Sequence, residues 1–387
     1  MAVADAAVAT CLACAMRIEP ANESYVARHA MARDQAGDTS EDVDAELHRA
    51  VAMNPRDSAV LRSLGVRAEL SGDPAQAEQY LQRAVAVDHS FQPQWALANF
   101  YLRVGRMDRF WPAIHYTLGI IEPKSSDPRV VAPEPVFDLC WNVTSDSEKI
   151  LAQAPQSKGL LLAYVRYLMR TGRGDAAVEA LPRVLASPSA PSDLPILTDL
   201  CDFLVRENRT AQAILVWNHL VGHGLIRSTR LDPERAQSVE NPAFTFPLVD
   251  RAFGWKLPRD EKIIVTTGDH FVAFEMSGTG PEHVELLSKV VPVLPERNYR
   301  LRWQVDASRL ETHGRKDTGL RMHLWGSGGE LSPACSPFLS GAVHSCSFAV
   351  PAGLSQLRLA LRYDRPLGAV TPEGVLRLEN VSLEFLP

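Results

Sequence analysis

The hydrophobic pattern of the chain changes its period near residue 240. Before that point, apolar residues recur every three to four positions, as on one face of an α-helix, in segments separated by short polar turns. From Phe244 onward, apolar and polar residues alternate, as in Tyr299–Asp306 and Leu357–Tyr363, which is typical of half-buried antiparallel strands. We therefore expect an all-α part over residues 1–225, a linker over 226–240 and an all-β part over 241–387.

The helical part consists of a repeat. Similar segments end at Pro20, Pro55, His89 and Pro123, at spacings of 35, 34 and 34 residues. Small residues let two antiparallel helices approach closely while larger apolar ones fill the space between them. The clearest copy, with its turn at Gly72, has such residues at Leu61, Leu64, Gly65, Ala68, Ala77, Leu81 and Ala84. The pattern and period resemble tetratricopeptide repeats, which implies an α-solenoid that binds proteins.

Two of the copies depart from the pattern, namely the one over residues 23–55, which has one extra residue in its turn, and the one over residues 124–155; we count about six copies in all. The last has Asn208 in place of the turn glycine, at a position where a left-handed residue is tolerated. The copy over residues 124–155 has a Pro-rich entry and a second helix that starts at a capping box, Ser145 to Glu148, so we expect a kink there. The first is a half-copy over residues 8–20, so the chain begins in the middle of a repeat.

The all-β part contains eight strand-like runs separated by Gly, Pro and Asp turns, which predicts a two-sheet jelly roll. Trp255 and Trp303 are expected in its core, and a phase change at Glu379 and Asn380 predicts a β-bulge. The order of its elements resembles carbohydrate-binding-module and galactose-binding-like jelly rolls. The whole arrangement is similar to bacterial tetratricopeptide proteins associated with exopolysaccharide and O-antigen assembly.

Composition narrows the class of protein. Forty Lys and Arg against forty-six Asp and Glu give a net charge of −6, which argues against nucleic acid as a partner. The apolar runs are too short for a membrane span. The first fifteen residues do not form a secretory signal, which favours the cytoplasm. A periplasmic or envelope location follows instead if a segment upstream of the half-repeat is missing.

Six cysteines are too few for a disulfide scaffold. Cys11, Cys14, Cys140 and Cys201 lie in predicted helices, where a free cysteine usually acts as a small buried hydrophobe. Cys335 and Cys346 lie in the β-rich part with Pro and Gly between them. In an oxidising compartment they can close a short loop by a disulfide; otherwise both stay thiols.

Motifs for catalysis are weak, and we expect no enzyme, no cofactor and no metal site. His219 and His223 stand four residues apart, but glycines flank the second and no glutamate of a zinc motif lies between them. The Gly-rich turn at residues 326–329 lacks the Lys-Ser/Thr of a phosphate-binding loop. Asp269 and His270 have no nucleophile in a recognisable context.

Binding surfaces are better supported. The first helices of the repeats line the concave face of a solenoid, and arginines on that groove favour an anionic ligand or an acidic peptide segment. The alternative is that these are solvated helix faces. We expect the protein-binding groove to consist of Arg62, Trp95, Asn99, Arg103, Arg166, Arg170 and Arg206.

An outward aromatic beside arginine and glutamine suits a sugar ring, since the ring's C–H face stacks and its hydroxyls accept and donate hydrogen bonds. We expect such a glycan-binding sheet face from Arg302, Gln304, Arg321, His323 and Trp325, with Arg358 and Arg362 beside them.

The sequence thus predicts an α + β multidomain scaffold whose solenoid binds a protein partner and whose sandwich binds a glycan or envelope component. The alternative is a carbohydrate-active enzyme or its accessory subunit, with Glu275 and Asp306 as paired carboxylates.

Overall fold

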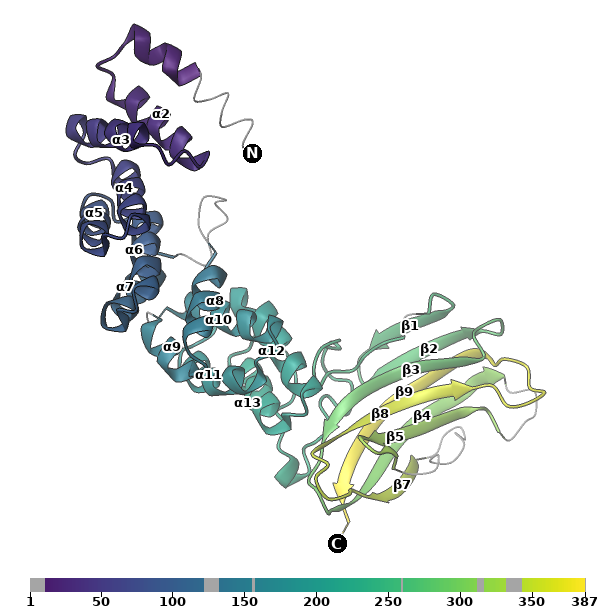
Figure 1. Ribbon diagram of the computed structural model, residues 1–387. Helices are drawn as coiled ribbons and strands as arrows, with labels where there is room; N and C mark the ends of the chain where they lie inside the picture. Colours follow the sequence, from purple (N-terminus) through teal and green to yellow (C-terminus); the bar gives the residue numbers. More distant parts are fainter. Residues whose placement is uncertain are drawn as a thin grey trace. The chain divides into compact units, whose positions relative to one another are not determined.

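A computed structural model describes residues 11–121, 132–154, 157–258, 260–311, 317–331 and 343–386. The chain divides into two compact units, Met1–Tyr167 and Leu168–Pro387, whose boundary lies within helix α10 (Lys158–Arg170). The first unit is helical, and the second contains the last helices together with the whole β part (Figure 1). No helix in the described ranges has both the length and the apolar character that a membrane crossing needs.

The first unit consists of antiparallel helix pairs, which confirms the predicted repeat. Residues 11–18 are helical, in agreement with an initial half-copy, although residues 8–10 lie outside the described part. The pairs that follow are α2 (Glu23–Gln35) with α3 (Glu41–Met53), α4 (Ser58–Leu70) with α5 (Pro74–Val87), α6 (Phe91–Arg103) with α7 (Met107–Gly119), and α8 (Glu134–Val143) with α9 (Ser147–Gln153).

Close packing between the two helices of a pair depends on small residues, as the sequence predicted. A Cβ atom added at Gly65 on α4 would lie 2.7 Å from Cγ of Leu81 on α5. Ala77 and Ala84 on α5 are fully buried beside it. The turn between the two helices is made by Gly72 in the left-handed region (φ 86°), which ends α4 and lets Asp73 cap α5.

The start of α9 and the turn at Asn208 can be compared with the predicted helix boundaries. Asp146 caps helix α9, and its side chain accepts a hydrogen bond from the Lys149 amide at 3.0 Å, so the predicted capping box at Ser145 was wrong by one residue. Asn208 has φ 58° at the turn between α12 (Leu194–Arg206) and α13 (Thr210–Gly222), which confirms its left-handed role. The Pro-rich entry at residues 124–131, where a kink was expected, lies outside the described residues.

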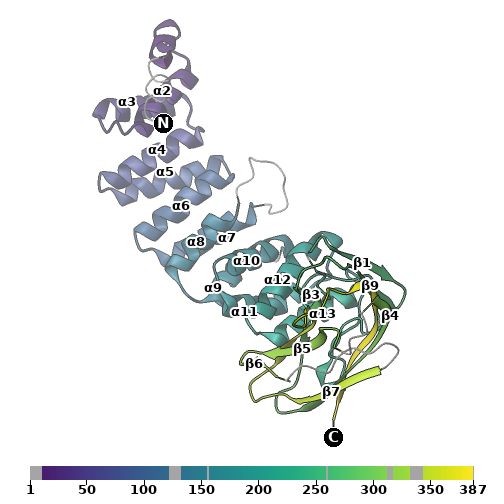
Figure 2. The same ribbon diagram turned by 90° about the vertical axis from the view of Figure 1, so that its right-hand side faces the viewer.

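The β part is a two-sheet antiparallel sandwich, as predicted (Figures 1 and 2). All eight expected runs are strands, and a short β6 follows the Gly-rich turn after β5. The five-stranded sheet has the order β1 (Ile263–Gly268), β2 (Phe271–Ser277), β9 (Glu373–Phe385), β4 (Asn298–Glu311), β7 (Val343–Ala349). The four-stranded sheet has the order β3 (His283–Pro292), β8 (Gln356–Asp364), β5 (Leu320–Gly326), β6 (Gly329–Glu330).

The core between the sheets comes from the inward residues of both. Trp255 and Trp303 are 1% and 2% exposed, which confirms them as core residues. The predicted β-bulge is also present: Gln304 pairs with Asn380 and Val305 pairs with Leu378, so Glu379 is the extra residue. The bulge returns both halves of β9 to the same inward face, and Leu378 and Val381 are both fully buried.

Residues 226–240, which were expected to be a linker, are held on both sides by hydrogen bonds. The Trp217 indole of α13 donates to the Thr229 carbonyl at 3.1 Å, and the Asn218 side chain both donates to and accepts from the Leu231 backbone at 2.8 Å. Toward the sandwich, the Lys289 ammonium of β3 donates to the Glu240 carbonyl at 2.8 Å and lies 3.3 Å from its carboxylate. The segment therefore joins α13 to β3 instead of separating them.

Two further sets of contacts join the last helix pair of the second unit to its sandwich. Arg251 makes ion pairs with Asp199 and Asp202 of α12 at 2.9 and 3.0 Å. Gln356 at the start of β8 donates to the Val205 carbonyl at 2.8 Å, and Thr210 bonds the same glutamine at 3.2 Å. Helices at the end of a repeat array need their exposed apolar side covered, and here the sandwich and its preceding segment cover it.

Candidate functional site

The five predicted glycan-binding residues lie on two different sheets. Arg302 and Gln304 belong to β4 of the five-stranded sheet, whereas Arg321, His323 and Trp325 belong to β5 of the four-stranded sheet. The outer faces of a sandwich point in opposite directions, so the prediction that all five line one face was wrong. Alternation along a strand separates inward from outward residues but does not tell which sheet a strand joins.

On the five-stranded sheet, the outward polar residues are paired with each other. Arg302 lies 3.3 Å from the Glu384 carboxylate, and Gln304 donates to Glu379 at 2.8 Å. On this face, Arg302 and Gln304 are therefore already paired with carboxylates of β9.

The paired carboxylates of the enzyme alternative lie on this same sheet. Glu275 is on β2 and Asp306 is on β4, with β9 between the two strands. Hydrogen bonds from the Ser308 side chain and backbone hold the pKa of Asp306 below its ordinary value. Asp306 therefore has the ionisation of a base or nucleophile, not of a general acid, which needs a raised pKa.

The outer face of the four-stranded sheet gathers the remaining candidates around Trp325. The Trp325 ring stacks on His323 with centroids 5.0 Å apart and planes 5° apart. The guanidinium carbons of Arg358 and Arg362 on β8 lie 5.3 and 5.9 Å from the Trp325 centroid. Register explains the meeting, since Trp325 pairs directly with Arg358, and Arg362 pairs with Arg321. We call Trp325, His323, Arg358 and Arg362 the tryptophan cluster.

Carboxylates hold the tryptophan cluster in position. His323 Nδ1 lies 2.6 Å from Glu330 on β6, Arg362 lies 3.3 Å from Asp364, and Arg358 pairs with Glu285 on β3. Beside the cluster, Arg321 pairs with Asp317 at 2.8 Å. The Gly319 amide, together with Arg321, lowers the pKa of Asp317 below its ordinary range. The face thus combines a fixed aromatic surface with charged hydrogen-bonding groups of both signs.

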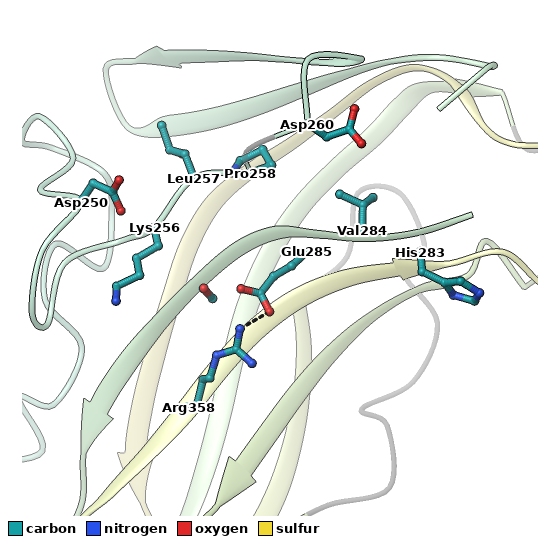
Figure 3. Close-up of a pocket in the computed structure, with 10 residues that line it drawn as sticks. Asp250, Lys256, Leu257, Pro258, Asp260, His283, Val284, Glu285 and Arg358 are labelled. Carbon is teal, nitrogen blue, oxygen red and sulfur yellow. Dashed lines mark hydrogen bonds and ion pairs between the residues drawn. The ribbon is translucent and has the colours of Figure 1, made fainter. Parts of the chain in front are cut away.

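A cavity of about 550 Å³ lies at the β3 edge of the same face, which is within the range of small-molecule sites. It forms because the Lys256 backbone bonds that of Ser288 in both directions, at 2.7 and 3.0 Å, so the preceding segment runs along β3. Figure 3 shows Glu285 of β3 and Arg358 of β8 paired among the residues that line the cavity. The cavity is lined by Asp250, Lys256, Leu257, Pro258, Asp260, His283, Val284, Glu285, Ser288 and Arg358.

Sequence reasoning named Arg358 but missed the other residues of the cavity. Glu285 has an outward position in a predicted strand, so the alternation carried a signal for it. Lys256 and Asp250 lie in a segment without periodicity, and their approach to β3 depends on one long-range backbone bridge. No local pattern in the sequence indicates such a bridge.

Four of the predicted groove residues lie on α4 and α6 of the first unit. Trp95 is half-buried and stacks on Phe91 at 5.7 Å, and Asn99 donates to the Trp95 carbonyl at 2.8 Å. Arg103 holds the Glu69 carboxylate with two bonds of 2.6 and 2.7 Å, which raise the pKa of the guanidinium. An incoming carboxylate would have to compete with Glu69 for Arg103. Arg62 is half-buried on α4.

The remaining groove candidates are exposed arginines. Arg166 lies on the part of α10 in the first unit, whereas Arg170 and Arg206 belong to the second unit. The structure also adds an apolar element that was not predicted: Val66 and Leu70 on α4 are 40% and 80% exposed. They stand one turn apart, and Leu70 follows Glu69, the partner of Arg103.

The prediction that the four helical cysteines act as buried hydrophobes is confirmed for Cys140 and Cys201 and was wrong for Cys11 and Cys14, which are exposed. Cys140 and Cys201 are free and fully buried, and burial raises the pKa of the Cys140 thiol to about 12. Cys11 and Cys14 are also free, and both are exposed. Cys346 is disulfide-bonded, but Cys335 lies outside the described residues, so this pairing stays a prediction.

The histidines of α13 have structural contacts. The rings of His219 and His223 have centroids 4.0 Å apart and planes tilted by 36°, and His219 Nε2 lies 2.8 Å from the Ser189 hydroxyl. No group of three or more His, Cys, Asp or Glu suited to a metal ion occurs in the described part of the chain.

No protein-family model and no curated protein matches the sequence. Several solved structures resemble one part of the chain each. MamA is 16% identical over 46% of this chain and 85% of its own, with a TM-score of 0.28. YrrB, a tetratricopeptide protein with an unusual peptide-binding site, is 9% identical over 55% and 94%, with a TM-score of 0.28. A CBM4 structure is 10% identical over 38% and 100%, with a TM-score of 0.27.

Proposed function

We propose that the protein is a non-catalytic adaptor whose helical repeats bind a protein partner and whose sandwich binds a glycan. The tryptophan cluster is the observation that carries the glycan part. Trp325 supplies an apolar surface for the C–H face of a sugar, and the surrounding arginines and carboxylates can donate to and accept from its hydroxyls. A role in exopolysaccharide or O-antigen assembly rests only on the resemblance of the sequence to such proteins.

The glycan part is tested with the full chain on an array of neutral and acidic oligosaccharides. Trp325→Ala should weaken binding of the captured glycan about five- to 150-fold, because a stacking contact contributes about 1 to 3 kcal/mol. Arg302→Ala on the opposite face is the matched control and should bind as the unchanged protein does. If both variants lose glycan affinity equally, or if Trp325→Ala loses none, the tryptophan cluster is not the glycan-binding site.

For the protein partner, the patch formed by Val66, Leu70 and the neighbouring Glu69–Arg103 pair supports the proposal, because it combines exposed apolar area with a polar pair. A partner purified with the full chain should dissociate more readily from Leu70→Asp, which places a charge on the patch. Gln82→Asp on α5 is the control, since Gln82 lies outside this patch. Binding that is insensitive to Leu70→Asp would place the partner on another surface.

A further inference from the structure

The cavity at the β3 edge is separate from the Trp325 ring but is connected to it through one residue. Arg358 lines the cavity, pairs with Glu285 inside it and lies 5.3 Å from the Trp325 centroid. A ligand that covers Trp325 and continues along the sheet toward β3 therefore reaches the cavity. His283, at its end, is directed to Asp364 by a contact of 2.9 Å.

Ser288 places a free hydroxyl at the cavity. The residue is 4% exposed, and its backbone amide and carbonyl are both used by Lys256. None of the hydrogen bonds found among the described residues uses its hydroxyl, although the residue lines the cavity. A hydroxyl that is fully enclosed normally has a hydrogen-bond partner. Ser288 Oγ is not among the fully enclosed polar atoms that lack a partner, so its free hydroxyl opens onto the cavity. The hydroxyl is therefore available to a ligand.

The charges around the hydroxyl indicate the class of ligand. Lys256 and Arg358 are cationic, whereas Asp250, Asp260 and Glu285 are anionic. An anionic ligand would be repelled by the carboxylates of the cavity, and a cationic ligand would be repelled by Lys256 and Arg358. Neighbouring hydroxyls of a sugar each donate and accept one or more hydrogen bonds, so they match walls of mixed sign without a net charge.

We propose that the cavity is a second binding position for a residue of a neutral glycan, with Ser288 and Lys256 as its hydrogen-bonding groups and Arg358 as the link to Trp325. The proposal rests on the function proposed above and adds to it both the ligand class and a second contact. The glycan then lies across β5, β8 and β3.

The test is calorimetric titration of the full chain with neutral oligomers of glucose, mannose, galactose and N-acetylglucosamine, and with matched uronic acid oligomers. Ser288→Ala removes only the hydroxyl, and Lys256→Met keeps the length of an exposed side chain. Each should weaken binding of the neutral oligomer about three- to tenfold, the usual effect of one lost hydrogen bond. Lys262→Met is the control, because Lys262 lies in the same region of the chain and outside the cavity.

The variants separate failure of the cavity proposal from failure of the proposed function. If Trp325→Ala abolishes binding while Ser288→Ala and Lys256→Met bind normally, the cavity is not a subsite and the proposed function stands. If the uronic acid oligomers bind more tightly than the neutral ones, the neutral class is wrong. If no oligomer binds the unchanged protein, both proposals fail. Melting temperatures equal to that of the unchanged protein confirm that the variants are folded.

Discussion

One lysine breaks the alternation of its strand. Lys289 pairs with Leu359 and so faces inward, where it is 1% exposed and lies 4.2 Å from the Trp255 ring centroid. Its partner Glu240 is fully buried and also accepts from the Ser228 hydroxyl at 2.5 Å. A buried charge pair with its remaining atoms bonded fixes one arrangement of the chain, because any other would leave a charge without a partner.

Removal of one partner should therefore be costly. We expect Lys289→Met to lower the free energy of unfolding by about 3 to 5 kcal/mol, since it leaves Glu240 buried and unpaired. The double variant Lys289→Met with Glu240→Gln should recover most of that loss. Urea unfolding of the three proteins measures both effects, and a double variant as unstable as the single one would contradict this explanation.

The same pair predicts a pH dependence. Burial lowers the pKa of Lys289 to about 8, against an ordinary value of 10.5, despite the opposing effect of Glu240. The unfolded chain then binds the proton more tightly than the folded chain between these values, so this group makes the free energy of unfolding rise with pH there. The difference in unfolding free energy between the unchanged protein and the double variant should increase from pH 7.5 to 10. A difference that falls with pH would show the opposite shift.

The absence of a side chain at Gly65 allows α4 and α5 to pack closely, and a substitution there tests this contact. Gly65→Leu should lower the free energy of unfolding by about 1 to 3 kcal/mol or more, because even its Cβ would lie 2.7 Å from Leu81. Val66→Leu is the matched control, since the neighbouring side chain is 40% exposed and has room for another methylene. Equal melting temperatures for the two variants would contradict the close approach of α4 and α5.

At the scale of elements, the left-handed turns decide where helices end. Asn208 between α12 and α13 takes the place that Gly72 has between α4 and α5. Asn208→Gly should be neutral or slightly stabilising, whereas Asn208→Val should cost about 1 to 2 kcal/mol, because a β-branched residue is strained at positive φ. Thermal unfolding of the two variants gives the comparison, and equal stability would exclude backbone strain as the reason for this residue.

The elements themselves were largely predictable, because each depends on local patterns. The helix pairs follow from turn residues such as Gly72 and Asn208 and from small residues such as Gly65, and the bulge at Glu379 follows from a change of phase within one strand. The site was predictable only in part. Trp325 and His323 were recognised as outward, but their separation from Arg302 is a matter of sheet order, and the cavity depends on a pairing of Lys256 with Ser288 that no local pattern encodes.

For the second unit as a whole, the contacts of residues 226–241 make the last helices and the sandwich interdependent. Ser238, Glu240 and Asn241 are fully buried, and the trypsin sites at Arg227, Arg230 and Arg235 lie just before them in the same segment. We expect trypsin to cleave these three sites slowly, since cleavage requires the local backbone to open. Mass spectrometry of a time course would show this, and early cleavage after Arg230 would indicate a free linker.

A division of the chain after residue 235 tests the same interdependence. The cut separates Ser228 and Thr229 from Glu240 and Asn241, which they bond at 2.5 and 3.0 Å. Fragments 1–235 and 236–387 should therefore each unfold at a lower temperature than the full chain, and mixing them should restore part of the loss. Two fragments with native melting temperatures would show that the halves fold separately.

The contacts of Arg251 with Asp199 and Asp202 bear on how this protein could have been assembled and could be re-engineered. A domain that is transferred between proteins has to include the elements that cover its hydrophobic core. For this sandwich, those elements include α12 and α13. Recombination at the start of the β part would leave Trp217 without its cover of Phe253, whose ring lies 6.0 Å away. A fusion of the sandwich to another protein should therefore begin before Leu194, so that it includes the final helix pair. The two parts are expected to be inherited together for the same reason.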